Sequence, residues 1–319
     1  MAVYTEVTDE ALETFLTEYD IGTIVAFRGI AEGVENSIYS LKTTHGDFIL
    51  TLYEKRVDPA DLPWFLGLME HLARGGINCP QPVRARDGEA LRVLAGRNAA
   101  ITTFLPGVWP RRVRVEHCGP VGRALAGLHL AGADYKPRRV NGLGAKDWRP
   151  LLERSWARAN EVQPTLAAEL DTTLAEILAA WPACLPEGHI HADLFPDNVF
   201  FLDDHLSGII DFYFAATDFY AYDVAVCLNA WCFEADFSFN VTKGRAMLHG
   251  YEAVRPMSAQ ERAALPVLCR GAAIRFLLTR LYDWLNTPDG AMVTRKDPLE
   301  YLRRLRFHRS ARDEHAYGL

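Results

Sequence analysis

The sequence predicts an α+β protein in which a small antiparallel sheet precedes a larger and mostly helical region. Short apolar or alternating runs at residues 24–27, 37–41 and 48–52 are joined by brief polar turns, the pattern of an antiparallel meander. From residue 118 onward, apolar residues recur at spacings of three and four, which indicates amphipathic helices. Residues 198–210 interrupt that pattern with two short apolar runs around a polar turn, which predicts a β-hairpin.

The composition is that of a globular protein and excludes several functional classes. The chain has 319 residues, of which 49% are hydrophobic and 24% are charged, so it is long enough for two lobes with a sizeable core. A formal charge of −7 disfavours a nucleic-acid-binding surface, and no segment approaches the roughly 18 consecutive apolar residues that a membrane span requires. Early acidic residues are untypical of a signal peptide, and the six cysteines lack metal-site spacing. We therefore expect a cytoplasmic protein without a nucleic-acid or membrane partner; the sequence does not indicate an oligomeric state.

The N-terminal part of the chain should contain a helix, the sheet and a second helix. The first helix is expected from residue 9, with Thr8 as its N-cap, and the second over residues 61–73. The remaining strands are expected at residues 91–94 and 99–104. Between the first two strands, Gly29 and Gly33 flank a turn. Because glycine lets backbone N–H groups approach a phosphate closely, this turn is a candidate phosphate-binding loop.

The second half of the chain should be mostly helical. Helices are expected over residues 118–129, 148–159, 166–180, 221–232, 262–285 and 298–307. Arg275 and Arg280 interrupt the apolar character of the fifth of these helices. A buried arginine needs a carboxylate partner. The expected partner is Asp223 or Asp283, and the alternative is the carboxylate of a substrate.

Three oxygen-bearing side chains cluster around the predicted hairpin. The hairpin should bring Asp211, at its exit, back beside Asn198, at its entry, and Asp193 lies in the loop that leads into it. Two carboxylates and a carboxamide oxygen in one small volume suit a hard divalent cation. One carboxylate would then remain to accept a proton from a hydroxyl group.

The order and spacing of these residues resemble a known signature. His191, Asp193, Asp197 and Asn198, followed by Asp211, are similar to the motif of the aminoglycoside-phosphotransferase-like kinases. The resemblance implies that Asp193 is the catalytic base and that Asn198 and Asp211 bind Mg²⁺ against the ATP phosphates. It also implies that His191 and Asp197 support the loop.

The same resemblance implies a bilobal protein-kinase-like fold, with a nucleotide-binding lobe at residues 1–104 and a catalytic and substrate-binding lobe at 105–319. Asn36 and Ser37, after the glycine turn, are then expected to contact ATP. Thr103 and Leu105 would contact the nucleotide at the hinge between the lobes.

One position departs from the wider kinase pattern. The strand that usually carries a phosphate-binding lysine has Thr51 in the expected place, so Thr51 is taken as an uncharged nucleotide contact. Lys42 and Lys55 are the candidates to supply the missing charge, unless Mg²⁺ carries more of it. Glu70 falls where the partner of that lysine would lie.

The acceptor is suggested by resemblance alone. Segments 35–39, 48–54, 211–213, 223–232 and 276–281 are similar to bacterial homoserine kinases built on this fold, which implies phosphorylation of the side-chain hydroxyl of L-homoserine. The candidate substrate contacts are Tyr213, Asp223, Asn229, Trp231, Arg275 and Arg280. For Asp223, support of the catalytic loop is the first expectation and substrate contact the second.

Two other functions stay open. The same machinery would serve a kinase for another small alcohol, such as an amino alcohol, a sugar or an aminoglycoside. The absence of a charge at Thr51 also allows an inactive nucleotide-binding pseudokinase.

Overall fold

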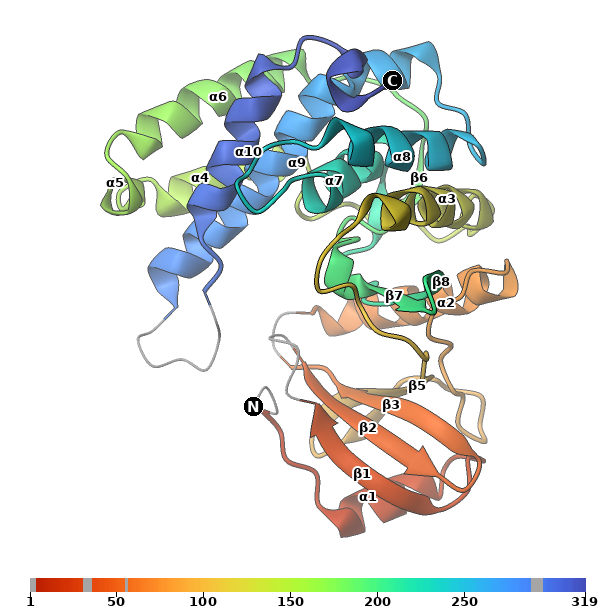
Figure 1. The fold of residues 1–319 in the computed structure, drawn as a ribbon. Helices are drawn as coiled ribbons and strands as arrows, with labels where there is room; N and C mark the ends of the chain where they lie inside the picture. Colours follow the sequence, from red (N-terminus) through yellow and green to blue (C-terminus); the bar gives the residue numbers. More distant parts are fainter. Residues whose placement is uncertain (1–3, 31–35, 55–56, 288–294) are drawn as a thin grey trace. The chain divides into compact units, whose positions relative to one another are not determined.

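The computed structural model describes residues 4–30, 36–54, 57–287 and 295–319 (Figure 1). The chain divides into two compact units. The first comprises Met1–Pro106 and Gly208–Tyr213, and the second comprises Gly107–Ser207 and Phe214–Leu319. The functional boundary expected between residues 104 and 105 stays a prediction.

The first unit contains a five-stranded antiparallel sheet in the order β1-β2-β3-β5-β4, which confirms the predicted meander. Its elements are α1 (Asp9–Leu16), β1 (Ile24–Ile30), β2 (Ser37–Thr43), β3 (Gly46–Leu52), a 3-10 turn (Pro59–Asp61), α2 (Leu62–Arg74), β4 (Arg92–Leu94) and β5 (Arg97–Thr103). The predicted N-cap is also present, because the Thr8 side chain accepts a hydrogen bond from the Ala11 amide at 3.3 Å. Alternation along the strands sends Leu41 and Leu50 into one core with Leu12 of α1, and each is completely buried. Burial of each leucine contributes about 2 kcal/mol, which holds α1 on the sheet.

The second unit is mainly helical. The elements after Pro106 are α3 (Val115–Ala131), α4 (Ala145–Ser155), α5 (Ala159–Val162), α6 (Leu166–Ala180), β6 (Glu187–Ile190), a 3-10 turn (Pro196–Asn198), β7 (Val199–Leu202), β8 (His205–Ile209), β9 (Ala216–Phe219), α7 (Tyr220–Trp231), α8 (Val241–Glu252), α9 (Ala259–Asn286), α10 (Pro298–Ser310) and a final 3-10 turn (Glu314–Tyr317). The last two residues of β8 belong to the stretch Gly208–Tyr213 of the first unit. Strands β7 and β8 pair as the predicted hairpin, and β6 pairs with β9. The expected α+β class is therefore confirmed.

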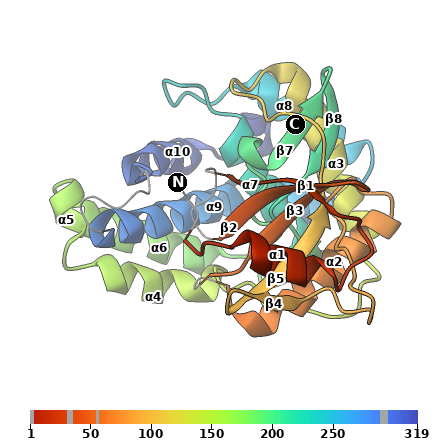
Figure 2. The same cartoon turned by 90° about the horizontal axis from the view of Figure 1, so that it is seen from below.

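Helix α9 is the longest element of the second unit, and Ser258 and Glu261 form a capping box at its start. Figure 2 shows α9 between α10 on one side and α4 and α6 on the other, and α9 also packs against α7. Among the helices that the structure describes, α9 included, none combines the length and the apolarity needed to cross a membrane.

Helices α3 and α8 pack with their backbones close together. A Cβ atom at Gly122 would lie 2.1 Å from the carbonyl oxygen of Met247, and one at Gly250 would lie 2.2 Å from that of Gly119. Any larger residue at either glycine would force the two helices apart. Both helices also contact α7.

Candidate active site

The loop between β6 and β7 contains the predicted catalytic motif, and its backbone is strained at Ala192. This residue has φ = 61°, a left-handed conformation that costs a non-glycine residue on the order of 1–2 kcal/mol. The carboxylate of Asp223 on α7 accepts hydrogen bonds from the amides of His191 and Ala192 at 2.7 and 2.8 Å. Asp223 is completely buried. Its carboxylate therefore supports the strained turn from the interior, which is the first of the two roles expected for it.

The side chains of the motif also shape the loop. The amide of Asp193 donates to Nδ1 of His191 at 3.3 Å, and Nδ2 of Asn198 donates to the carbonyl oxygen of Asp193 at 2.9 Å. His191 is fully buried, whereas the side chain of Asp193 keeps 19% of its surface exposed. Asp197 is exposed. Thus the residue predicted to be the base keeps part of its side chain in solvent, while buried His191 and Asn198 hold the loop.

The arginines of α9 have other partners than those expected. Nη1 of Arg275 donates to the carbonyl oxygen of Ala192 at 3.2 Å and to Oδ1 of Asp193 at 3.3 Å. Arg280 forms an ion pair with Glu300 at 2.7 Å. Arg275 therefore pairs with Asp193, and not with Asp223 as expected, and the ion pair of Arg280 is with Glu300. Both of the carboxylates that pair with them lie outside α9, Asp193 in the catalytic loop and Glu300 in α10, so the pattern of the helix could not indicate them.

Two further candidates for substrate contact lie in the interior. Nε1 of Trp231 donates to the carbonyl oxygen of Leu194 at 2.8 Å, so Trp231 holds the same loop. Nδ2 of Asn229 donates to the carbonyl oxygens of Ala225 and Cys269 at 3.0 and 3.1 Å. Trp231 and Asn229 have no exposed surface and offer no face to a ligand in this structure.

A chain of buried polar groups continues from Asp223. Nε2 of His129 lies 3.0 Å from Oδ2 of Asp223, and its Nδ1 lies 2.7 Å from the Tyr251 hydroxyl. Nη1 of Arg255 donates to that hydroxyl at 3.1 Å and is paired with Glu261 at 2.8 Å. The network thus connects the catalytic loop with α3, with α8 and with the start of α9.

The protonation states in this network follow from the environment. Burial lowers the pKa of His129, so its imidazole is neutral at pH 7. Burial alone raises the pKa of Asp223, but hydrogen bonds from His129 and from the His191 amide outweigh it and hold this pKa below its usual value. The assignment that satisfies every group has Nε2–H of His129 donating to Asp223 and the Tyr251 hydroxyl donating to Nδ1.

Two buried histidines should make stability depend on pH. Burial lowers the pKa of His129 and lowers that of His308 to about 3, whereas an unfolded histidine titrates near 6.5. The unfolded state therefore binds more protons below about pH 6.5, and the free energy of unfolding should decrease as the pH falls below that value. For His308 alone, the expected loss between pH 7.5 and 5 is about 2 kcal/mol.

This dependence can be measured by urea unfolding at pH 7.5, 6 and 5, where most carboxylates stay ionised. The variant His308→Gln should lose part of the pH dependence, and His249→Gln, at an exposed position, should keep it. An unchanged pH dependence in His308→Gln would contradict the assignment.

In the first unit, Glu54 holds the two predicted contacts that follow the glycine turn, Asn36 and Ser37. Gly29 lies in β1 opposite Tyr39, whereas the predicted contact at position 33 lies outside the described residues, as does position 55. The Ser37 hydroxyl donates to Oε1 of Glu54 at 2.7 Å, and the carboxamide oxygen of Asn36 accepts from the Glu54 amide at 3.3 Å. Both side chains are buried, so they order the start of β2 from within the unit.

Thr51 is buried on β3 and is not a free contact. Its side chain is hydrogen-bonded to Tyr213, whose hydroxyl also lies 2.9 Å from that of Tyr53. Burial raises the pKa of Tyr213 to about 12, so this phenol stays neutral. Asp211, with φ = 64°, belongs to the same unit, whereas Asp193 and Asn198 belong to the other. The predicted meeting of these three side chains stays a prediction.

The candidates for a replacement charge can be placed in part. Lys42 is exposed and lies opposite Asp47 in the register of β2 and β3. Thr51 lies opposite Ile38, near the other end of β2. Four residues of strand separate these positions, about 13 Å, so Lys42 does not fill the place of the strand lysine. Glu70 instead binds Arg84 through both of its oxygens, at 3.1 and 2.6 Å.

The predicted hinge residues lie at the end of β5 and just after it. The hydroxyl of Thr103 accepts a hydrogen bond from the Gln81 amide at 3.0 Å, and Leu105 is buried. Contact of either residue with a nucleotide stays a prediction.

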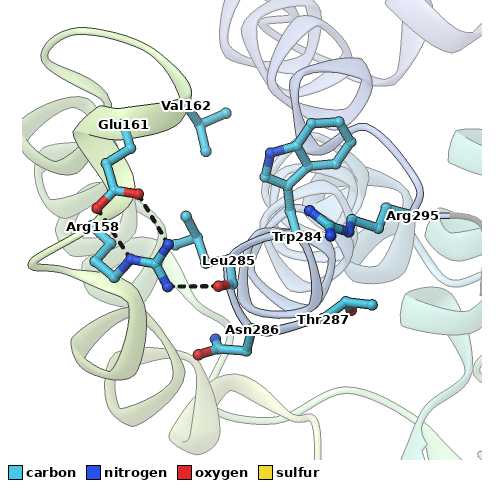
Figure 3. Close-up of a pocket in the computed structure, with 8 residues that line it drawn as sticks. All are labelled: Arg158, Glu161, Val162, Trp284, Leu285, Asn286, Thr287 and Arg295. Atoms are coloured by element: carbon cyan, nitrogen blue, oxygen red, sulfur yellow. Dashed lines mark hydrogen bonds and ion pairs between the residues drawn. The ribbon is translucent and has the colours of Figure 1, made fainter. Parts of the chain in front are cut away.

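A polar cavity of about 460 Å³ lies elsewhere, in the second unit (Figure 3). It is lined by Arg158, Glu161, Val162, Trp284, Leu285, Asn286, Thr287 and Arg295. Arg158 crosses it to Glu161 at 3.0 Å and to the carbonyl oxygen of Leu285 at 2.6 Å. The cavity contains none of the predicted site residues.

Comparisons with known proteins agree with the expected family. The phosphotransferase enzyme family matches residues 26–257. The chain is 72% identical over 319 residues to a homoserine kinase from Acidiphilium cryptum and 71% identical over 319 residues to one from Granulibacter bethesdensis. Both alignments cover 100% of this chain and 100% of the relative.

Solved structures show the same fold at low sequence identity. An amicoumacin kinase in complex with AMP-PNP, Ca²⁺ and Ami has a TM-score of 0.70 at 14% identity, covering 94% of this chain and 93% of that one. A choline kinase from Cryptosporidium parvum has a TM-score of 0.68 at 14% identity, covering 94% of each chain. These likenesses confirm the expected kinase-like fold. Because the family match extends over most of the sequence and the relatives align along all of it, the chain belongs to the phosphotransferase enzyme family.

Proposed function

We propose that the chain transfers the γ-phosphoryl group of ATP to the side-chain hydroxyl of L-homoserine, which yields O-phospho-L-homoserine, a step toward threonine. The observation that carries the proposal is the identity of 71% and 72% with homoserine kinases along the whole chain. Use of ATP follows from membership in a family of kinases. A cytoplasmic location is part of the proposal, because ATP is made there and the six cysteines are free thiols.

In the proposed mechanism, Asp193 accepts the proton of the acceptor hydroxyl during in-line transfer. Two observations support this role: the carboxylate is partly exposed, and the backbone around it is fixed by Asp223 and Trp231. Asn229 lies in the same core, where its Nδ2 atom donates to backbone carbonyl oxygens of α7 and α9. We propose that these three interior residues act on the substrate only through the loop, whereas Tyr213 stays a candidate for shaping the acceptor pocket.

Asn198 and Asp211 are proposed to hold Mg²⁺, which would neutralise charge on the transferred phosphoryl group. The donor set fits this ion, because Mg²⁺ usually takes one or two protein oxygens and completes its coordination with water and phosphate oxygens. Since Nδ2 of Asn198 is used by the Asp193 carbonyl, the Oδ1 atom is the one left for a cation. His191 and Asp197 are proposed as supports of this arrangement.

The nucleotide is proposed to bind along Gly29, Gly33, Asn36, Ser37 and Thr51, with Thr103 and Leu105 at the adenine. The Ser37 hydroxyl is occupied by Glu54, and that of Thr51 by Tyr213. We therefore propose that backbone N–H groups and Mg²⁺, rather than side-chain hydroxyls, meet the phosphates.

The acceptor is distinguished by its two charges, and Arg275 and Arg280 are the candidate cations for its carboxylate. The test is ADP release with four alcohols: L-homoserine, 3-amino-1-propanol without the carboxylate, 4-hydroxybutanoate without the ammonium group, and L-serine, which is one methylene shorter. Each lost charged contact is worth about 1.5–3 kcal/mol. The expected kcat/KM is therefore at least about 10-fold higher for L-homoserine than for either analogue with one charge.

A higher kcat/KM for any of the other three alcohols than for L-homoserine would replace this acceptor with another alcohol. If ATP binds but no alcohol of the panel causes ADP release, the chain would be a pseudokinase.

A further inference from the structure

We infer that Arg275 is a positioning residue that locks the catalytic loop, by holding the strained Ala192 peptide and the Asp193 carboxylate with one nitrogen atom. The inference rests on the proposed function in taking Asp193 as the base. It gives Arg275 a different role from the substrate contact considered above.

Both peptide groups that flank the Cα atom of Ala192 are held. The N–H group of Ala192 donates to Oδ1 of Asp223 at 2.8 Å, and its carbonyl oxygen accepts from Nη1 of Arg275 at 3.2 Å. A residue at φ = 61° keeps that conformation only when its surroundings impose it. Helices α7 and α9 therefore fix the backbone of Ala192 together, α7 at its N–H group and α9 at its carbonyl oxygen.

The same nitrogen also orients the carboxylate of Asp193. Nη1 of Arg275 lies 3.3 Å from Oδ1 of Asp193, while it contacts the carbonyl oxygen one residue earlier. A donor shared between a peptide oxygen and the next side chain restricts the rotation of that side chain. The second carboxylate oxygen, Oδ2, is then the one presented to an acceptor hydroxyl.

The guanidinium group is itself held rigidly. The Arg275 side chain is only 4% exposed, and its guanidinium carbon lies 3.9 Å from the ring centroid of Phe276 and 5.3 Å from that of Phe214. A planar guanidinium can lie against such rings while its N–H groups point in fixed directions. A lysine at this position would keep the charge but would lose the plane that sets those directions.

The first test is Arg275→Lys, compared with Arg262→Lys on the same helix. Arg262 is partly exposed, pairs with Glu252 at 2.7 Å and lies outside the proposed site. For Arg275→Lys we expect kcat to fall about 10- to 100-fold, with the KM for ATP and for L-homoserine within about twofold of wild type. Arg262→Lys should match wild type. A raised KM for L-homoserine with an unchanged kcat would overturn the inference and make Arg275 a substrate contact.

The second test isolates the strained peptide. Glycine adopts φ = 61° without penalty, so Ala192→Gly should lessen the need for Arg275 at the carbonyl oxygen. The double variant Ala192→Gly/Arg275→Lys should therefore regain part of the lost kcat, about threefold or more. Strictly multiplicative effects of the two substitutions would show that Arg275 does not act through this peptide.

The third readout does not need turnover. Amide hydrogen exchange at His191, Ala192 and Asp193 should be faster in Arg275→Lys than in wild type or Arg262→Lys. Unchanged exchange would overturn the inference even in an active enzyme. If the wild type does not phosphorylate L-homoserine but amide exchange is still faster in Arg275→Lys, the proposed acceptor is wrong and the positioning role of Arg275 is kept.

Discussion

Replacing Asp193 by asparagine is expected to lower kcat about 10³-fold. Asparagine has the same shape but cannot accept the proton of the acceptor hydroxyl, and a general base typically contributes 10²- to 10⁴-fold. The hydrogen bonds with His191 and Asn198 use the backbone of Asp193 and remain in the variant, and the carboxamide oxygen of asparagine can still accept from Arg275. The measurement is steady-state ADP release with L-homoserine, accompanied by calorimetric titration with an ATP analogue.

Nucleotide affinity of Asp193→Asn should stay within a few-fold of wild type, which separates a lost base from a collapsed site. A suitable control is Asp203→Asn, in the turn between β7 and β8. Asp203 has φ = 49°, and asparagine tolerates this conformation as well as aspartate does. Near-wild-type turnover in Asp193→Asn would show that another group accepts the proton.

The variant Asp223→Asn is expected to destabilise the protein by about 3–5 kcal/mol, the usual result of breaking a buried charged network. The carboxylate of Asp223 accepts from two amides and from Nε2 of His129, and it donates to none of them. In asparagine, one of these oxygens becomes an NH₂ group that must face another N–H donor. At least one buried donor then loses its partner.

The change can be measured by urea unfolding at pH 7.5. Asp171→Asn provides the matched control, because Asp171 is 48% exposed and belongs to a surface ion pair with Arg149. That variant should lose less than about 1 kcal/mol. A loss below 1 kcal/mol in Asp223→Asn would mean that the loop does not depend on this carboxylate.

Local patterns were sufficient to predict most of the elements. The alternation in β2, the apolar run in β3, the Thr8 cap and the helix Leu166–Ala180 are encoded by neighbouring residues, and the structure has them where they were expected. Strands β6 and β9 were missed because four residues are too few to show a period of two. Helix α8 was missed because glycine and polar residues interrupt its apolar face.

Partners that are distant in the sequence were harder to predict. The need of Arg275 for a carboxylate follows from its apolar surroundings, but the identity of that carboxylate, Asp193, depends on how α9 crosses the loop. The same holds for Glu70, which binds Arg84 on a different segment. The hydrogen bond from Trp231 to the Leu194 carbonyl gave no signal in sequence, because an apolar helix position looks the same whether or not its indole has an acceptor.

The support of the loop by α7 limits how this enzyme can be recombined with its distant relatives. Because the backbone of residues 191–194 relies on Asp223 and Trp231, a graft of the motif without α7 would leave its amides and carbonyls unmatched. Chimeras that exchange acceptor preferences should therefore place their crossover points after Trp231 rather than directly behind the hairpin.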